Sequence, residues 1–254
     1  MKSIRTFFLI LIIAYSQNVL AISNYKFGDT LYVWAKAGLN MRVSAAANAS
    51  VIEKLPYGKQ VIIADHDIGK ASFSVKVFNE SGFVLQGFWV KVNMGDKSGY
   101  VFDAYLSRLA PLKIIESNGY KRYESELEYF EREFEVQKTP TDKSENVGGN
   151  PDSEPLITDV YESIYGITIK KWDSGSANKI EIEISELSFE EGYVLANMFY
   201  DFENFNKEIV EYNNPKKLVI TSKDNNAQFS LNSTRYYTIE EKDNKLTISF
   251  LKQF

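Results

Sequence analysis

Alternating apolar residues dominate the chain between residues 30 and 109, and no other sequence feature constrains the fold as strongly. Runs such as VIEKL (51–55), SFSVKVF (72–78) and FVLQGFWVKV (83–92) place every second side chain on one face. Turns rich in Gly, Pro, Asn and Asp separate these runs at intervals of about 8–12 residues. Short strands between regular turns are typical of a small all-β barrel or sandwich. The sequence therefore predicts a small all-β domain, a barrel or a sandwich, over residues 22–112.

The hydrophobic period changes after this region. The segment YKRYESELEYFEREFEV places its apolar side chains on one helical face: Tyr123, Leu127, Phe130 and Phe134. This spacing predicts an amphipathic helix within residues 113–136. Residues 137–156 combine Pro and Gly with Asp, Ser, Lys and Asn, which predicts a linker.

The remaining part, residues 157–254, mixes strand and helix patterns. The sequence from 188 to 205 has a helical apolar face, with Ser188 as N-cap and Glu191 at the capping-box spacing. Six alternating runs surround it, at 165–172, 178–185, 217–223, 227–231, 235–242 and 245–251. Their order around a single helix predicts an α+β domain, an antiparallel sheet with one packed helix.

Residues 1–21 have the pattern of a secretory signal peptide. Lys2 and Arg5 precede an apolar run of nine residues, and Val19 and Ala21 fit a small-residue cleavage site. A membrane span needs about 20 apolar residues, so we expect cleavage and no stable span afterwards. The chain also has no cysteine that could carry a lipid anchor or form a disulfide. We expect an exported protein, periplasmic or secreted.

Charge and composition exclude several functions. Residues 22–112 carry a balance of +3 and residues 113–254 a balance of −10. Such an acidic protein lacks the basic footprint that nucleic acid requires. With no cysteine and a single histidine, His66, the chain has few ligands for a transition metal. No phosphate loop, nucleophile elbow or zinc-binding helix motif is present, so we predict no enzyme activity, cofactor or metal.

Four blocks of the N-terminal region occur together in a known family. These are LNMR (39–42), VIEKLPYGKQVII (51–63), WVKV (89–92) and GYVFDAYLS (99–107). In this order they resemble bacterial SH3-like domains, the small β-barrels of cell-envelope proteins. An extra hairpin over residues 68–87 is similar to variants in exported proteins of Bacteroidota-type bacteria. The resemblance covers about 80 of 254 residues and implies a targeting or ligand-binding module.

Large aromatic and polar residues of these blocks form the candidate site. They are Trp34, Asn40, Arg42, Trp89, Tyr100, Phe102 and Tyr105. In one interpretation the aromatic rings line a groove for a peptide or sugar, and Asn40, Arg42 or Asp103 supplies polar contacts. In the other, the same rings fill the core of a small barrel. The sequence leaves both open.

The leading hypothesis is a non-enzymatic binding protein for a cell-envelope ligand, such as a peptidoglycan peptide, or for a protein partner. One alternative is a hydrolase that works with carboxylates alone, using pairs such as Glu190 and Glu191. Another is an inhibitor or assembly factor for a different exported protein, which the acidic C-terminal half would suit.

Overall fold

The computed structural model describes residues 25–66, 71–77, 83–117, 119–139, 144–145, 156–173, 176–202, 218–223, 225–231 and 235–253. The predicted signal peptide at residues 1–21 lies outside these ranges, as does most of the predicted linker.

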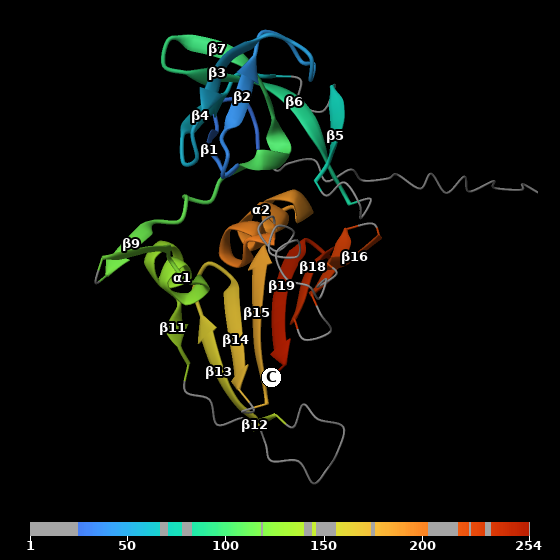
Figure 1. Ribbon diagram of the computed structural model, residues 1–254. Coiled ribbons are helices and arrows are strands. Elements are labelled where there is room, and N and C mark those ends of the chain that lie inside the picture. The colour runs from blue at the N-terminus through green and yellow to red at the C-terminus, as the bar shows by residue number, and fades with distance from the viewer. Residues whose placement is uncertain are drawn as a thin grey trace, which may run out of the picture.

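Eight short strands of the N-terminal half form one antiparallel sheet (Figure 1). They are β1 (Thr30–Val33), β2 (Leu39–Arg42), β3 (Val51–Leu55), β4 (Gln60–Ile63), β5 (Ser72–Lys76), β6 (Val84–Met94), β7 (Lys97–Phe102) and β8 (Leu106–Ser107). A 3-10 turn, η1 (Asp103–Tyr105), joins the last two. Alternation explains the packing of β4, because Val61 and Ile63 are buried while Gln60 and Ile62 are exposed.

This sheet differs from the closed barrel that the sequence predicts. Its order is β3-β2-β7-β6-β4-β1-β8, with β5 paired to β6. Within the described ranges, the two strands at the ends of this order, β3 and β8, do not pair with each other. Because β8 is only two residues long and pairs with β1, it offers little backbone for closing the ring.

The segment predicted as one long helix divides into a hairpin and a short helix. Strands β9 (Ile114–Ser117) and β10 (Tyr120–Tyr123) pair with each other, and α1 spans Glu126–Phe134. Ser125 caps α1 in a capping box with Glu128. Tyr123, predicted on the apolar face of a helix, therefore lies in a strand. Phe130 is buried, as an inward-facing residue of α1 should be.

The C-terminal half forms a nine-stranded antiparallel sheet. Its strands are β11 (Gln137–Lys138), β12 (Ser144–Glu145), β13 (Leu156–Glu162), β14 (Ile167–Asp173), β15 (Ala177–Ser185), β16 (Leu218–Lys223), β17 (Asn226–Leu231), β18 (Arg235–Lys242) and β19 (Lys245–Gln253). The order is β11-β13-β14-β15-β19-β18-β17-β16, with β12 on β13. The six runs predicted from alternation lie in this sheet, whereas β11, β12 and β13 were not predicted.

Helix α2 (Phe189–Tyr200) lies between the two sheets (Figure 1). Ser188 and Glu191 form the capping box that the sequence predicts at its start. At Gly192 the helix approaches β19 so closely that an added Cβ would lie 2.6 Å from a Leu246 side-chain carbon. Near the other end, the Tyr200 ring lies 5.0 Å from that of Tyr237 on β18.

A single hydrophobic cluster joins the two halves of the chain. It includes Trp34 and Phe83 from the N-terminal half and Tyr193 and Phe229 from the C-terminal half. The Phe83 ring lies 5.2 Å from the Tyr193 ring and 5.3 Å from the Phe229 ring. A second, smaller cluster lies inside the N-terminal sheet alone. The two halves therefore share one hydrophobic core, to which helix α2 contributes Tyr193.

Candidate ligand-binding cavity

Polar contacts fix both ends of α2 to the N-terminal half. Near the start of the helix, Oε1 of Glu191 accepts hydrogen bonds from Oγ of Ser107 at 2.8 Å and from the backbone N–H of Arg108 at 3.2 Å. At the other end, Nζ of Lys36 lies 2.6 Å from Oδ1 of Asp201, the C-cap residue. One face of α2 and its C-cap carries residues at helical spacing, at positions 191, 194, 197 and 201.

A cavity of about 360 Å³ lies between α2 and the N-terminal sheet. It lies within the 300–1,000 Å³ range of small-molecule sites. Six of the seven residues predicted from the sequence line it: Trp34, Asn40, Arg42, Trp89, Phe102 and Tyr105. The seventh, Tyr100, is on β7 opposite Arg42 and is not among the described lining residues.

Aromatic rings form one wall of the cavity. Phe73 on β5 lies 5.1 Å from Trp89 and 5.2 Å from Phe102, measured between ring centroids. Trp89 and Phe102 are 7% and 3% exposed, and Trp34 is 2% exposed. The indole N–H of Trp34 donates to the backbone oxygen of Leu109 at 2.9 Å. These side chains therefore belong to the hydrophobic core and also present apolar surface to the cavity.

Two polar side chains of the cavity wall have unmatched hydrogen-bonding atoms. Nη1 of Arg42 donates to the backbone oxygen of Ala49 at 2.6 Å. Its Nε atom is buried and has no hydrogen-bond partner in the described part of the chain. The same holds for Oδ1 of Asn197 on α2, a residue that is 8% exposed. A buried polar atom without a partner typically destabilises a protein by about 1–3 kcal/mol.

The sequence-based candidate site lacked ten of the sixteen residues of this wall, and four of the ten come from elements that it did not place there. Phe73 and Val75 come from β5, and Val194 and Asn197 come from α2. The alternation of SFSVKVF indicated that β5 has an apolar face, but not which neighbour it meets. No pattern in the sequence indicated that α2 faces the N-terminal sheet.

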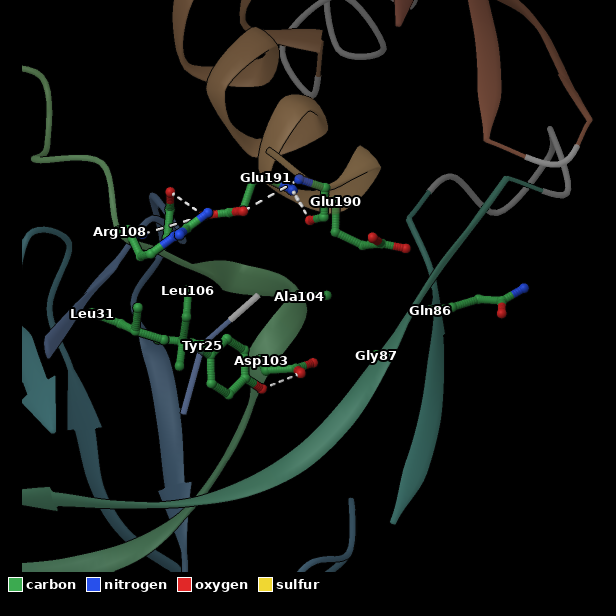
Figure 2. A pocket seen from close by; sticks show the side chains of 12 residues that line it. Tyr25, Leu31, Gln86, Gly87, Asp103, Ala104, Leu106, Arg108, Glu190 and Glu191 are labelled. Carbon is green, nitrogen blue, oxygen red and sulfur yellow. Dashed lines mark hydrogen bonds between the residues drawn. The ribbon is translucent and has the colours of Figure 1, made fainter. Parts of the chain in front are cut away.

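A second, much smaller pocket lies at the start of α2 (Figure 2). Oδ1 of Asp103 accepts the backbone N–H of Phe88 at 2.6 Å, and Oδ2 accepts the hydroxyl of Tyr25 at 2.5 Å. Burial raises the pKa of Glu190 to about 7, and the nearby carboxylates of Asp103, Glu241 and Glu191 raise it further. The pocket volume is about 10 Å³, enough for roughly one water molecule.

The described residues contain no group of three or more histidine or carboxylate side chains arranged to hold a metal ion. The single histidine, His66, stacks on Phe27 with 3.9 Å between ring centroids. Across the same part of the chain, we find no helix with the length and apolar character needed to cross a membrane.

The short antiparallel strands with a 3-10 turn before the last one define a small β-domain of the SH3-like class. A family model for the bacterial SH3 domain matches residues 37–107, so the chain contains a bacterial SH3 domain. This match includes β2 to β8 and most of the residues that line the cavity. Neither a curated protein nor a solved structure matches the chain.

Proposed function

We propose that this protein is a non-enzymatic binding protein of the cell envelope, which holds its ligand between the SH3 domain and helix α2. The cavity of about 360 Å³ carries this proposal. It combines an apolar wall with a few polar groups, the composition that small-molecule and peptide sites favour. Bacterial SH3 domains often bind cell-wall ligands, so a peptide of the cell wall is the ligand that we propose first.

The signal-peptide pattern of the sequence supports a role in the envelope. The positive, apolar and small-residue order of residues 1–21 favours a cleaved signal peptide. The proposal predicts that secreted or periplasmic material begins near Ile22. Sequencing the N-terminus of the protein recovered from an exporting bacterial host tests this point directly.

A carboxylate-based hydrolase is less well supported. One small pocket, of only about 10 Å³, is lined by the three acidic residues Asp103, Glu190 and Glu191. A glycosidase needs two carboxylates on opposite sides of a bond of its substrate, and this space admits no sugar. The Glu191 carboxylate also accepts hydrogen bonds from Oγ of Ser107 and from the backbone N–H of Ser188. We therefore place ligand binding ahead of hydrolysis.

Sedimentation with purified cell-wall sacculi tests the proposal. Ala47 is an exposed residue of the cavity wall, and the neighbouring Asn48 is exposed but is not part of the described wall. Ala47→Trp places an indole at the site, whereas Asn48→Trp adds the same group outside it. We expect the wild type and Asn48→Trp to pellet with sacculi and Ala47→Trp to remain largely in solution.

Two results would contradict this proposal. If the wild type does not pellet above a control without sacculi, at low and moderate salt, the protein has no cell-wall ligand. Equal pelleting of both tryptophan variants would place binding at some other surface.

A further inference from the structure

The hydrogen-bonding groups and the charge of the cavity wall indicate what kind of ligand it accepts. We propose that the cavity binds a carboxyl-terminal amino-acid unit, in which an acylated N–H, a carboxylate and an apolar side chain lie together. In this proposal Asn197 of α2 accepts the N–H, and Arg42 of β2 binds the carboxylate. The inference rests on the proposed function, because it concerns the same cavity.

Asn197 is the first reason. Its Oδ1 atom is a buried acceptor without a partner among the described residues. An acceptor in this state is stabilised by a donor N–H from outside the chain. The terminal torsion of an asparagine side chain is broad and roughly two-fold, so the amide can turn towards a ligand at little cost. Val194, one turn earlier on α2, adds apolar surface beside it.

Arg42 is the second reason. Its buried Nε is a donor without a partner in the described ranges, the complement of the Asn197 acceptor. A ligand that satisfies both must therefore carry a donor and an acceptor, as an acylated amino acid does. Guanidinium groups also match the planar geometry of a carboxylate.

The charge of the wall selects a carboxylate over a neutral acceptor. Among the described residues that line the cavity, Lys36 and Arg42 are charged and none is acidic. Lys36 is already paired with Asp201. Arg42 has no carboxylate within ion-pair distance in the described part of the chain. An anionic ligand group would therefore meet an uncompensated positive charge.

The apolar wall accounts for the third part of the ligand. Phe73, Trp89 and Val75 present aromatic and aliphatic surface. An aliphatic side chain of the size of leucine gains free energy by leaving water for such a surface. The cavity volume of about 360 Å³ is sufficient for one such residue together with its acyl group.

Three small probes separate these contributions. N-acetyl-leucine carries the N–H, the carboxylate and the side chain. N-acetyl-leucinamide lacks the carboxylate, and 2-acetoxy-4-methylpentanoic acid replaces the N–H by oxygen. Binding is followed by nuclear magnetic resonance titration of the full mature chain. Because the probes are small, we expect a millimolar dissociation constant for N-acetyl-leucine, and an affinity about tenfold lower for each of the other two.

Substitutions assign the two contacts. In Asn197→Ala, N-acetyl-leucine and the acetoxy acid should bind with equal affinity, because the acceptor for the N–H is gone. In Arg42→Gln, N-acetyl-leucine and N-acetyl-leucinamide should bind with equal affinity, because the cation that binds the carboxylate is gone. Asn93→Ala changes an exposed asparagine of β6 and should retain the wild-type order of affinities.

Stability separates binding from a structural role. Asn197→Ala removes a buried acceptor that has no partner in the free protein, so the midpoint of its urea unfolding should be unchanged or higher. A lower midpoint would show that the amide holds the fold together, and the proposal would then be wrong. Equal binding of all three probes to the wild type, or binding of none, would overturn it as well.

The two proposals can fail independently. Sacculus binding that depends on Ala47, with no preference for N-acetyl-leucine, would retain the proposed function and reject this ligand class. A clear preference for N-acetyl-leucine without sacculus binding would retain the ligand class and place its source outside the cell wall.

Discussion

Oγ of Ser107, at the end of β8, donates a hydrogen bond to Oε1 of Glu191 in the first turn of α2 over 2.8 Å. Both residues are buried, and the same carboxylate also accepts the backbone N–H of Arg108. The hydroxyl oxygen of Ser107 in turn accepts the backbone N–H of Leu109 at 3.1 Å. One serine therefore connects the SH3 domain to the capping box of a helix from the other half of the chain.

Removing this serine hydroxyl should destabilise the protein. Ser107→Ala leaves part of a buried carboxylate and one backbone N–H without partners, so we expect a loss of about 1–3 kcal/mol. Urea unfolding measures the change. Ser98→Ala, at an exposed serine of β7, should have little effect. A loss below 0.5 kcal/mol in Ser107→Ala, roughly the range of neutral surface changes, would count against the connection.

Glu190 should make stability depend on pH near neutrality. Burial, assisted by the neighbouring carboxylates, raises its pKa to about 7 in the folded protein. The folded state then binds this proton more tightly than the unfolded state, so its contribution to stability is lost as pH rises from about 4.5 to 7. Glu190→Gln should be more stable than the wild type at pH 8, by about 1–2 kcal/mol because the side chain remains partly exposed.

Thermal unfolding of the wild type and Glu190→Gln from about pH 2 to 8 measures this difference. Glu128 serves as a control in another pH window, because hydrogen bonds from Arg122 and Ser125 lower its pKa to about 2. The contribution of Glu128 is lost as pH falls below about 4.5. Glu128→Gln should therefore change the unfolding temperature at acidic pH and leave it unchanged near neutral pH. Parallel curves for the wild type and Glu190→Gln would refute the assignment.

Gly192 should be required for the close approach of α2 to β19. An added Cβ would lie 2.6 Å from Cδ2 of Leu246, inside normal contact distance. Because the contact is with the end of a flexible side chain, we expect Gly192→Ala to destabilise by about 1–3 kcal/mol rather than to prevent folding. In a Leu246→Ala background the same substitution should have a smaller effect. An unchanged effect in that background would mean that Leu246 does not cause the destabilisation.

Phe83 should couple the unfolding of the two halves. Its ring lies next to Phe189, Tyr193 and Phe229, and its side chain is 1% exposed. We expect Phe83→Ala to reduce stability by about 3–5 kcal/mol. The wild type should unfold in one transition by both tryptophan fluorescence and far-UV circular dichroism, whereas the two signals should separate in the variant. Separate transitions already in the wild type would show that the shared cluster does not couple them.

The sequence predicted those elements that are determined by residues close together in the chain. The capping box of Ser188 and Glu191 is complete within four residues, and the structure confirms it. The hairpin of β14 and β15 likewise follows from alternation on both sides of a short turn. The bacterial SH3 domain was recognised from four short blocks, and the family match at residues 37–107 confirms that resemblance.

Elements that depend on distant contacts were predicted less well. Tyr120–Tyr123 fits a helical spacing with the residues after it, yet it pairs with Ile114–Ser117. Gly119, at φ +78°, provides the turn conformation that other residues adopt less readily. Asn197 was not predicted to lie in a site, because nothing near it in the sequence indicates that the SH3 domain covers its side of α2.

The shared hydrophobic cluster has a consequence for how the chain reaches its fold. Phe83 is synthesised long before Tyr193 and Phe229, the residues whose rings pack against it. Contacts between such distant positions raise the contact order and slow folding. Until α2 and β17 arrive, the nascent SH3 domain exposes aromatic surface and is prone to aggregation. Expressing residues 22–112 alone would make that transient state permanent.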